Sequence, residues 1–138
     1  MKVLVFYVNS FEYTPNQKSL DIAPDCPTAT TIINDAILAF IHAEPSDQDE
    51  NLKSRDKKLA NHLKWCCRKN NTTNVIIHSF AHLAEAKADW EFTQNLLNQC
   101  DIRLKNGGFV THQTPFGHFL DLKIDAPGHS LARLWKTL

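Results

Sequence analysis

The sequence has 138 residues and a formal net charge of zero, with 15 lysine and arginine residues balanced by 15 aspartate and glutamate residues. Hydrophobic residues make up 43% and charged residues 22%, which is typical of one globular domain with a buried core. The balanced charge excludes a strong overall attraction to nucleic acid or membranes, so any nucleic-acid partner requires a local basic patch.

The cysteines and the N-terminus indicate a cytoplasmic protein. Cys26, Cys66, Cys67 and Cys100 show no C-x-x-C spacing, and adjacent cysteines suit neither a zinc site nor a disulfide framework. We interpret them as buried or incidental thiols in a reducing cytosol. The run Met1 to Val8 is too short to span a membrane and lacks a small-residue cleavage site. The sequence therefore predicts no membrane partner, no metal site and no cofactor.

The first part of the chain predicts strands followed by a loop. The apolar run Val3 to Val8 is typical of a strand buried on both faces. Asn9-Ser10 predicts a turn into a second strand, Phe11 to Thr14. The prolines and aspartates between Leu20 and Thr30 predict a loop.

The next part predicts a strand and then a basic helix. Thr31 to Ala43 fits either a strand or a helix, and its isoleucines favour a strand at least from Ala36 to Ala43. Asn51 to Lys69 has apolar residues at helical spacing and predicts a helix. Its dense positive charge fits a solvated surface or a patch that contacts phosphates. The apolar stripe is Leu59, Leu63, Cys66 and Cys67, and the basic residues are Lys53, Arg55, Lys57, Lys58, Lys64, Arg68 and Lys69.

A second strand-helix unit follows. Asn74 to Ser79 predicts a short buried strand, and Asp89 to Lys105 predicts a helix that Asn106-Gly107-Gly108 ends. Because strands alternate with helices here, the chain predicts an α/β layered domain.

The C-terminal part predicts two strands and a helix. A first strand opens at Phe109-Val110, and Pro115-Phe116-Gly117 breaks the chain before a second strand, His118 to Ile124, whose apolar residues alternate. Such a break can hold backbone groups open toward a ligand. The last ten residues, His129 to Leu138, predict a short helix because their apolar residues recur at i, i+3, i+4 and i+7.

Among seven histidines, His82 is the strongest functional candidate. It follows a buried strand, and ligand sites of α/β sheets form at strand ends. A histidine there can act as a general acid or base, and Phe80 can stack on a base or form a pocket wall. We interpret His42, His62 and His112 as surface or half-buried residues. No glycine-rich nucleotide loop, G-x-S-x-G or H-E-x-x-H motif is present.

Phe80-Ala81-His82-Leu83 and Pro115-Phe116-Gly117, with weaker matches along nearly the whole chain, resemble a known family. It is the editing domain at the N-terminus of archaeal threonyl-tRNA synthetases, which is similar in fold to D-aminoacyl-tRNA deacylases. The resemblance implies one domain over residues 1–138, with two packed sheets and usually a homodimer. Its expected order is two strands, two strand-helix units, two or three further strands and a short C-terminal helix.

The resemblance also implies a substrate and site residues. The substrate is the aminoacylated 3′ end of tRNA, first of all seryl-tRNA(Thr), and a threonyl-tRNA synthetase is a further candidate partner. His82 corresponds to the family's pocket histidine and is the catalytic candidate, while the main chain at Ala43 corresponds to the reader of the terminal adenine. The implied substrate-binding residues are Ala43, Phe80, Ala81, Pro115, Phe116, Gly117, Phe119 and Leu120. The candidates for contacts with the tRNA backbone are Lys57, Lys58 and Lys64.

The chain departs from the family at Phe119 and Leu120, where the family has a tyrosine and a lysine, and at Arg133, where it has an acidic residue. Lys123 cannot replace the lysine because strand alternation places it on the face opposite Leu120. A lysine ammonium can position water or stabilise developing negative charge. Without this lysine there are two alternatives. One is hydrolysis by a free-standing domain that acts in trans, and the other is binding of a tRNA or a synthetase without chemistry. A small-molecule or nucleotide pocket unrelated to tRNA is a third alternative.

Overall fold

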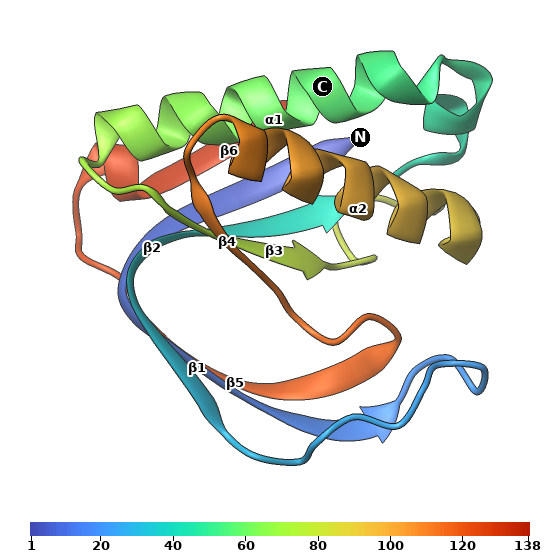
Figure 1. Cartoon of the computed structure of the whole chain (residues 1–138), viewed down its shortest axis with the longest axis horizontal. Coiled ribbons are helices and arrows are strands. Elements are labelled where there is room, and N and C mark those ends of the chain that lie inside the picture. The colour runs from blue at the N-terminus through green and yellow to red at the C-terminus, as the bar shows by residue number, and fades with distance from the viewer.

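The structure, a computed structural model, describes residues 1–138. Two long helices lie side by side on one face of a six-stranded sheet (Figure 1). Neither helix is both long enough and apolar enough to cross a membrane. The elements in chain order are β1 (Lys2–Lys18), β2 (Thr31–His42), the 3-10 helix η1 (Pro45–Asp49), α1 (Leu52–Lys69), β3 (Asn74–Ser79), α2 (Trp90–Asn106), β4 (Val110–Gln113), β5 (His118–Asp125), the 3-10 helix η2 (Ser130–Ala132) and β6 (Arg133–Thr137).

The strand β1 pairs with three other strands of the sheet. One edge pairs antiparallel with β2 over nearly its whole length, and β3 and β4 continue the sheet in parallel pairing. The other edge pairs first with β6 and then with β5. The resemblance implied two packed sheets, whereas the structure has one sheet that bends because β1 and β2 run through both halves (Figure 1).

The predicted turn at Asn9-Ser10 is wrong, because β1 continues through it. Val8 still pairs with Ala36 and Ser10 with Asn34, so the ladder to β2 is kept on both sides. The irregularity lies in the partner strand, where Asp35 has a positive φ of 50° and accepts a 2.7 Å hydrogen bond from the Tyr7 hydroxyl. The turn signal therefore marks a bend in a strand pair and not its end.

The predicted helix over His129 to Leu138 is wrong apart from the short 3-10 turn η2. Residues Arg133–Thr137 form β6, which pairs with Lys2 to Phe6 along the part of this edge of β1 that β5 does not reach. Leu134 packs against the core while its neighbour Trp135 is 53% exposed. A few apolar residues in a short segment fit both a helical and a strand period. Here the hydrogen-bonded pairing with β1 makes the segment a strand.

The two long predicted helices, Asn51 to Lys69 and Asp89 to Lys105, and the strands β2, β3 and β5 are confirmed. The Asn51 side chain caps α1 by accepting a 2.9 Å hydrogen bond from the Lys53 N–H, and Gly107 ends α2. The apolar stripe of α1 is buried against the sheet together with Cys100. Burial raises the pKa of Cys66 to about 11 and of Cys67 to about 12, so both thiols are protonated at neutral pH. All four cysteines are free.

Candidate functional site

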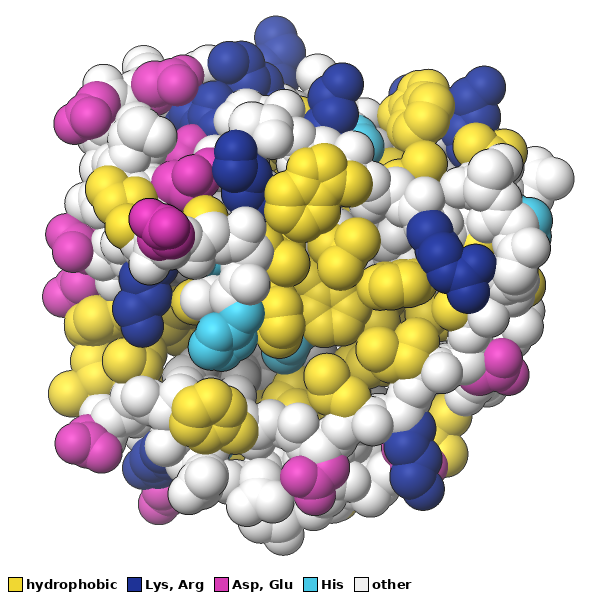
Figure 2. All heavy atoms as spheres, turned by 180° about the vertical axis from the view of Figure 1, so that it is seen from behind, with side chains coloured by type: hydrophobic (Ala, Val, Ile, Leu, Met, Phe, Trp, Pro, Cys, Tyr) yellow, Lys and Arg dark blue, Asp and Glu magenta, His cyan; other side chains and the backbone are white.

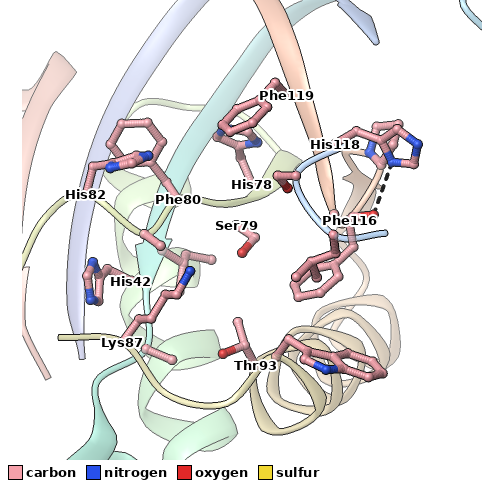
Figure 3. A pocket seen from close by; sticks show the side chains of 18 of the residues that line it. His42, His78, Ser79, Phe80, His82, Lys87, Thr93, Phe116, His118 and Phe119 are labelled. Carbon is pink, nitrogen blue, oxygen red and sulfur yellow. Dashed lines mark hydrogen bonds between the residues drawn. The ribbon is translucent and has the colours of Figure 1, made fainter. Parts of the chain in front are cut away.

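A pocket of about 550 Å³ lies where the parallel strands β2, β3 and β4 end. Loops that follow these carboxyl ends, the first turns of α2 and the start of β5 line it, which is the usual place for ligands in α/β sheets. In Figure 3, Phe80 and His82 lie on one side of the pocket, Phe116 and His118 on the other, and Ser79 between them.

The structure brings together in this pocket all the residues predicted to bind the substrate and the catalytic candidate His82. The lining includes Ala43, Phe80, Ala81, His82, Pro115, Phe116, Gly117, Phe119 and Leu120. The predicted tRNA-backbone contacts are elsewhere. Lys57 and Lys58 are exposed on α1, Lys64 is half-buried, and none of them lines the pocket.

Gly117 fixes one wall of the pocket. Its φ of +78° lies in the left-handed region that favours glycine, and an added Cβ would be 2.8 Å from the Cβ of Ala23. Its carbonyl accepts hydrogen bonds from the N–H groups of Ser19 at 2.8 Å and Leu20 at 3.2 Å. The break between β4 and β5 is thereby tied to the loop that follows β1.

Several peptide N–H groups at the pocket have no hydrogen-bond partner within the chain. They belong to Ala43, Ala81, His82, Phe116 and Gly117, which lie just beyond strand ends or in the turn before β5. Backbone N–H groups seek acceptors, so these are available to water or to a ligand. Two of these groups, at Phe116 and Gly117, lie in the proline-phenylalanine-glycine break that was expected to hold backbone groups open toward a ligand.

Aromatic contacts hold the loop that carries His82. Phe80 packs edge-to-face on Phe40 of β2, with ring centroids 4.9 Å apart, and His82 packs edge-to-face on Phe80 at 5.1 Å. His82 itself is exposed and forms no hydrogen bond within the chain. Its imidazole nitrogens therefore remain free for a ligand or a water molecule.

His42 is a structural residue that the sequence did not identify. We interpreted it as a surface or half-buried residue, but it is only 1% exposed because its face of β2 is covered by the loop after β3. Its Nδ1 accepts a 3.0 Å hydrogen bond from the Leu83 N–H, so its Nε2 carries the proton and donates at 2.7 Å to the Ala86 carbonyl. His42 thus fixes two points of the loop between Phe80 and Ala88.

His78 is the second buried histidine at the pocket. It is 7% exposed, its Nδ1 lies 2.8 Å from the Thr114 hydroxyl, and burial lowers its pKa to about 4. The imidazole is therefore neutral at pH 7. Its signal in the sequence was alternation along β3, which places it on the same face as Ile76 and Phe80.

The pKa of His78 predicts that folding stability falls with acidification from about pH 6.5 to about pH 4. In this window the unfolded chain binds a proton at residue 78 that the folded chain does not. The loss is at most about 1.4 kcal/mol per pH unit. Urea unfolding at pH 7 and pH 4.5 should show a smaller loss for His78→Gln than for the wild type. The exposed-histidine control His112→Gln should keep the wild-type loss, and an equal loss in all three contradicts the assignment.

The polar groups of the pocket do not form a nucleophile-base pair. Ser79 and Thr93 line it, but the Ser79 hydroxyl forms no hydrogen bond with any histidine. No group of three or more histidine, cysteine, aspartate or glutamate side chains is arranged to hold a metal ion. The aromatic walls of the pocket suit an organic group, to which the lining presents hydroxyl and imidazole side chains.

The departures from the family have different places in the structure. Phe119, which is 50% exposed, and Leu120 both line the pocket, so they present apolar side chains where the resemblance implied a tyrosine and a lysine. Arg133, the first residue of β6, does not line the pocket. Its side chain donates a 3.1 Å hydrogen bond to the Pro127 carbonyl.

The fold is similar to that of a solved structure. The "c-Myc DNA Unwinding Element Binding Protein" superposes with a TM-score of 0.68 at 12% sequence identity, and the match covers 100% of this chain and 99% of that chain. At this identity the likeness concerns the fold alone. It confirms the expected layered α/β fold of the D-aminoacyl-tRNA deacylase type.

The sequence matches the family described as the archaea-specific editing domain of threonyl-tRNA synthetase over residues 1–138, and the chain belongs to this family. Similar proteins include the threonine–tRNA ligases of Thermofilum pendens, 26% identical over 141 residues, and Thermococcus sibiricus, 24% identical over 142 residues. Both matches cover 100% of this chain and 22% of the ligase. The chain thus spans about a fifth of the length of these relatives.

Proposed function

We propose that this domain hydrolyses the ester of mischarged aminoacyl-tRNA, with seryl-tRNA(Thr) as its first substrate, and that it acts in trans. The observation that carries the proposal is the pocket itself. The two motifs of the family meet there across the ends of β3 and β4, with unpaired N–H groups from both. Membership of the editing-domain family supports a role in tRNA editing.

The geometry supports a reaction in which the backbone and the substrate contribute most of the chemistry. Water adds to the ester carbonyl and gives a tetrahedral oxyanion, which backbone N–H groups can stabilise as hydrogen-bond donors. The C–O bond to the terminal ribose then breaks, the ribose oxygen takes a proton, and free amino acid and tRNA leave. His82, with both imidazole nitrogens free, orients the water or a ribose hydroxyl.

The test is ester hydrolysis by the purified chain. Seryl-tRNA(Thr), threonyl-tRNA(Thr) and D-aminoacyl-tRNAs are each incubated with the protein, and loss of the amino acid is followed over time. Faster loss of serine than of threonine is expected, because seryl-tRNA(Thr) is the proposed error product: one methyl group gives a synthetic site only about 1–3 kcal/mol with which to reject serine. His82→Ala should slow hydrolysis. No hydrolysis of any substrate at high protein concentration contradicts the enzymatic proposal.

Leu120 favours a second candidate function, binding of a tRNA end or a synthetase without hydrolysis. Its side chain lines the pocket where the family has a lysine, so one charged group is absent from the wall. Leu120→Lys separates the two candidates. Hydrolysis that appears only in this variant means that the wild-type pocket binds without catalysing, whereas hydrolysis by the wild type excludes the silent alternative.

The basic helix α1 gives a separate prediction about the tRNA backbone. Replacing Lys57, Lys58 and Lys64 together by glutamine should weaken tRNA binding and reduce its dependence on salt, because fewer counterions are then released. Filter binding at several salt concentrations measures the slope. Since none of these residues lines the pocket, binding of a small 3′-end analogue should not change. An unchanged salt slope means that the helix is only a solvated surface.

We also propose that the domain forms a homodimer. Figure 2 shows hydrophobic side chains gathered at the centre of the face seen from behind. The free edge of β6 and the 53% exposed Trp135 are further surfaces that a second copy can cover. Sedimentation at several protein concentrations tests this proposal, and a monomer at all of them contradicts it.

A further inference from the structure

Lys87 is the only lysine or arginine that lines the pocket. The only carboxylate in the lining, Asp89, is engaged elsewhere. Its carboxylate accepts a 2.9 Å hydrogen bond from the Gln48 side chain, and its own peptide N–H donates at 2.9 Å to the side-chain oxygen Oε1 of Gln48. Lys87 itself forms no ion pair within the chain. The pocket therefore holds one ammonium group that forms no salt bridge with an acidic side chain.

The loop that carries Lys87 is held on both sides of this residue. The Ala86 carbonyl accepts the hydrogen bond from the buried His42, and the Ala88 N–H donates at 2.9 Å to the Ala43 carbonyl. Figure 3 shows the Lys87 side chain directed into the pocket from this loop, between His42 and Thr93. The fold thus fixes the backbone from which the ammonium reaches the site.

The surroundings of Lys87 indicate the chemical class of its partner. The side chain is exposed, so its ammonium stays hydrated and can move. Such a group suits a solvated phosphate better than a reacting carbonyl, which needs a donor in a fixed position. The neighbouring aromatic walls suit a base or a ribose.

We propose that Lys87 binds a phosphate of the nucleotide end that occupies the pocket, an inference that rests on the proposed function. It gives the pocket a specificity for a nucleotide over the corresponding nucleoside. A 3′-terminal residue of RNA carries this phosphate on its 5′ side, so the contact also sets the direction in which the strand leaves the pocket.

The test uses two analogues that cannot be hydrolysed. Both are 3′-amino-3′-deoxyadenosine carrying serine as an amide, one with a free 5′-hydroxyl and one with a 5′-phosphate. Calorimetry measures their dissociation constants for the wild-type chain, Lys87→Gln and Lys87→Arg. The control is Lys123→Gln, which removes an exposed lysine that pairs with Glu12 at 3.0 Å and does not line the pocket.

The wild type should bind the phosphorylated analogue about 2- to 10-fold more tightly, a difference that shrinks as the salt concentration rises. Lys87→Gln should lose this preference and keep its affinity for the nucleoside analogue, whereas Lys87→Arg and Lys123→Gln should keep the preference. Equal binding of both analogues by the wild type, or a preference that survives in Lys87→Gln, overturns the role of Lys87 but leaves the proposed function standing. Binding of neither analogue contradicts the proposed function and this inference together.

Discussion

Replacing Asp47 by alanine is expected to lower the free energy of unfolding by about 3–5 kcal/mol. Asp47 is 1% exposed, and its carboxylate pairs with the guanidinium of Arg55, which is also 1% exposed. It pairs further with the amino group of Met1 at 3.1 Å and accepts a 2.7 Å hydrogen bond from the Glu44 N–H. Its removal leaves a buried cation without its main partner, and that costs more than an intact ion pair contributes.

Glu50→Ala is the matched control for Asp47→Ala. Glu50 also contacts Arg55, at 3.4 Å, but about half of its side chain is exposed, so water replaces it when it is removed. The expected loss is below about 1 kcal/mol. Urea unfolding at neutral pH measures both variants. Similar losses for the two variants would show that burial does not set the strength of this contact.

Gly117→Ala is expected to lower the free energy of unfolding by about 2–4 kcal/mol and to abolish ligand binding. An alanine at a φ of +78° costs about 1–2 kcal/mol by itself. The new Cβ would in addition lie 2.8 Å from the Cβ of Ala23, which cannot rotate away because it is attached directly to the backbone. To relieve this contact, the turn must move away from the loop that follows β1, and the pocket wall moves with it.

Two other glycines separate the effect of backbone strain from that of steric overlap. Gly108→Ala introduces a side chain at a φ of +86° with no atom within 4 Å, so only the strain of about 1–2 kcal/mol is expected. Gly128→Ala meets nothing within 4 Å and has no such φ, so little change is expected. Urea unfolding and binding of the seryl-adenosine analogue measure all three variants. A loss for Gly117→Ala no larger than that for Gly108→Ala would mean that the contact with Ala23 is relieved without cost.

Local sequence patterns were sufficient to predict the helices α1 and α2 and the strand β5. The apolar spacing along α1 predicted that helix, and Asn106-Gly107-Gly108 predicted the end of α2, since both signals act within a few residues. The alternation from His118 along β5 is likewise local. The pocket was predicted because its motifs directly follow strands, and because their resemblance to the family placed them at one site.

The errors concern contacts between segments that are far apart in the chain. The apolar spacing of Leu131, Leu134 and Trp135 fits a helix, and only the free edge of β1 makes it a strand. The burial of His42 depends on a loop some forty positions later in the chain, which bonds to it from Leu83 and Ala86. A property that depends on a distant partner leaves no periodic pattern at the residue itself.

The two edges of β1 also set an order for folding during synthesis. The strands β2 and β3 and the helix between them follow soon after β1, whereas β5 and β6 come from the last part of the chain. One whole edge of β1 therefore stays unpaired until β5 and β6 have been made, and its closure joins segments far apart in the sequence, such as Lys2 with Thr137. Such non-local pairing is slow in general, so we expect the pairing of β5 and β6 to control the rate at which the sheet forms and the time for which an open edge is exposed to aggregation.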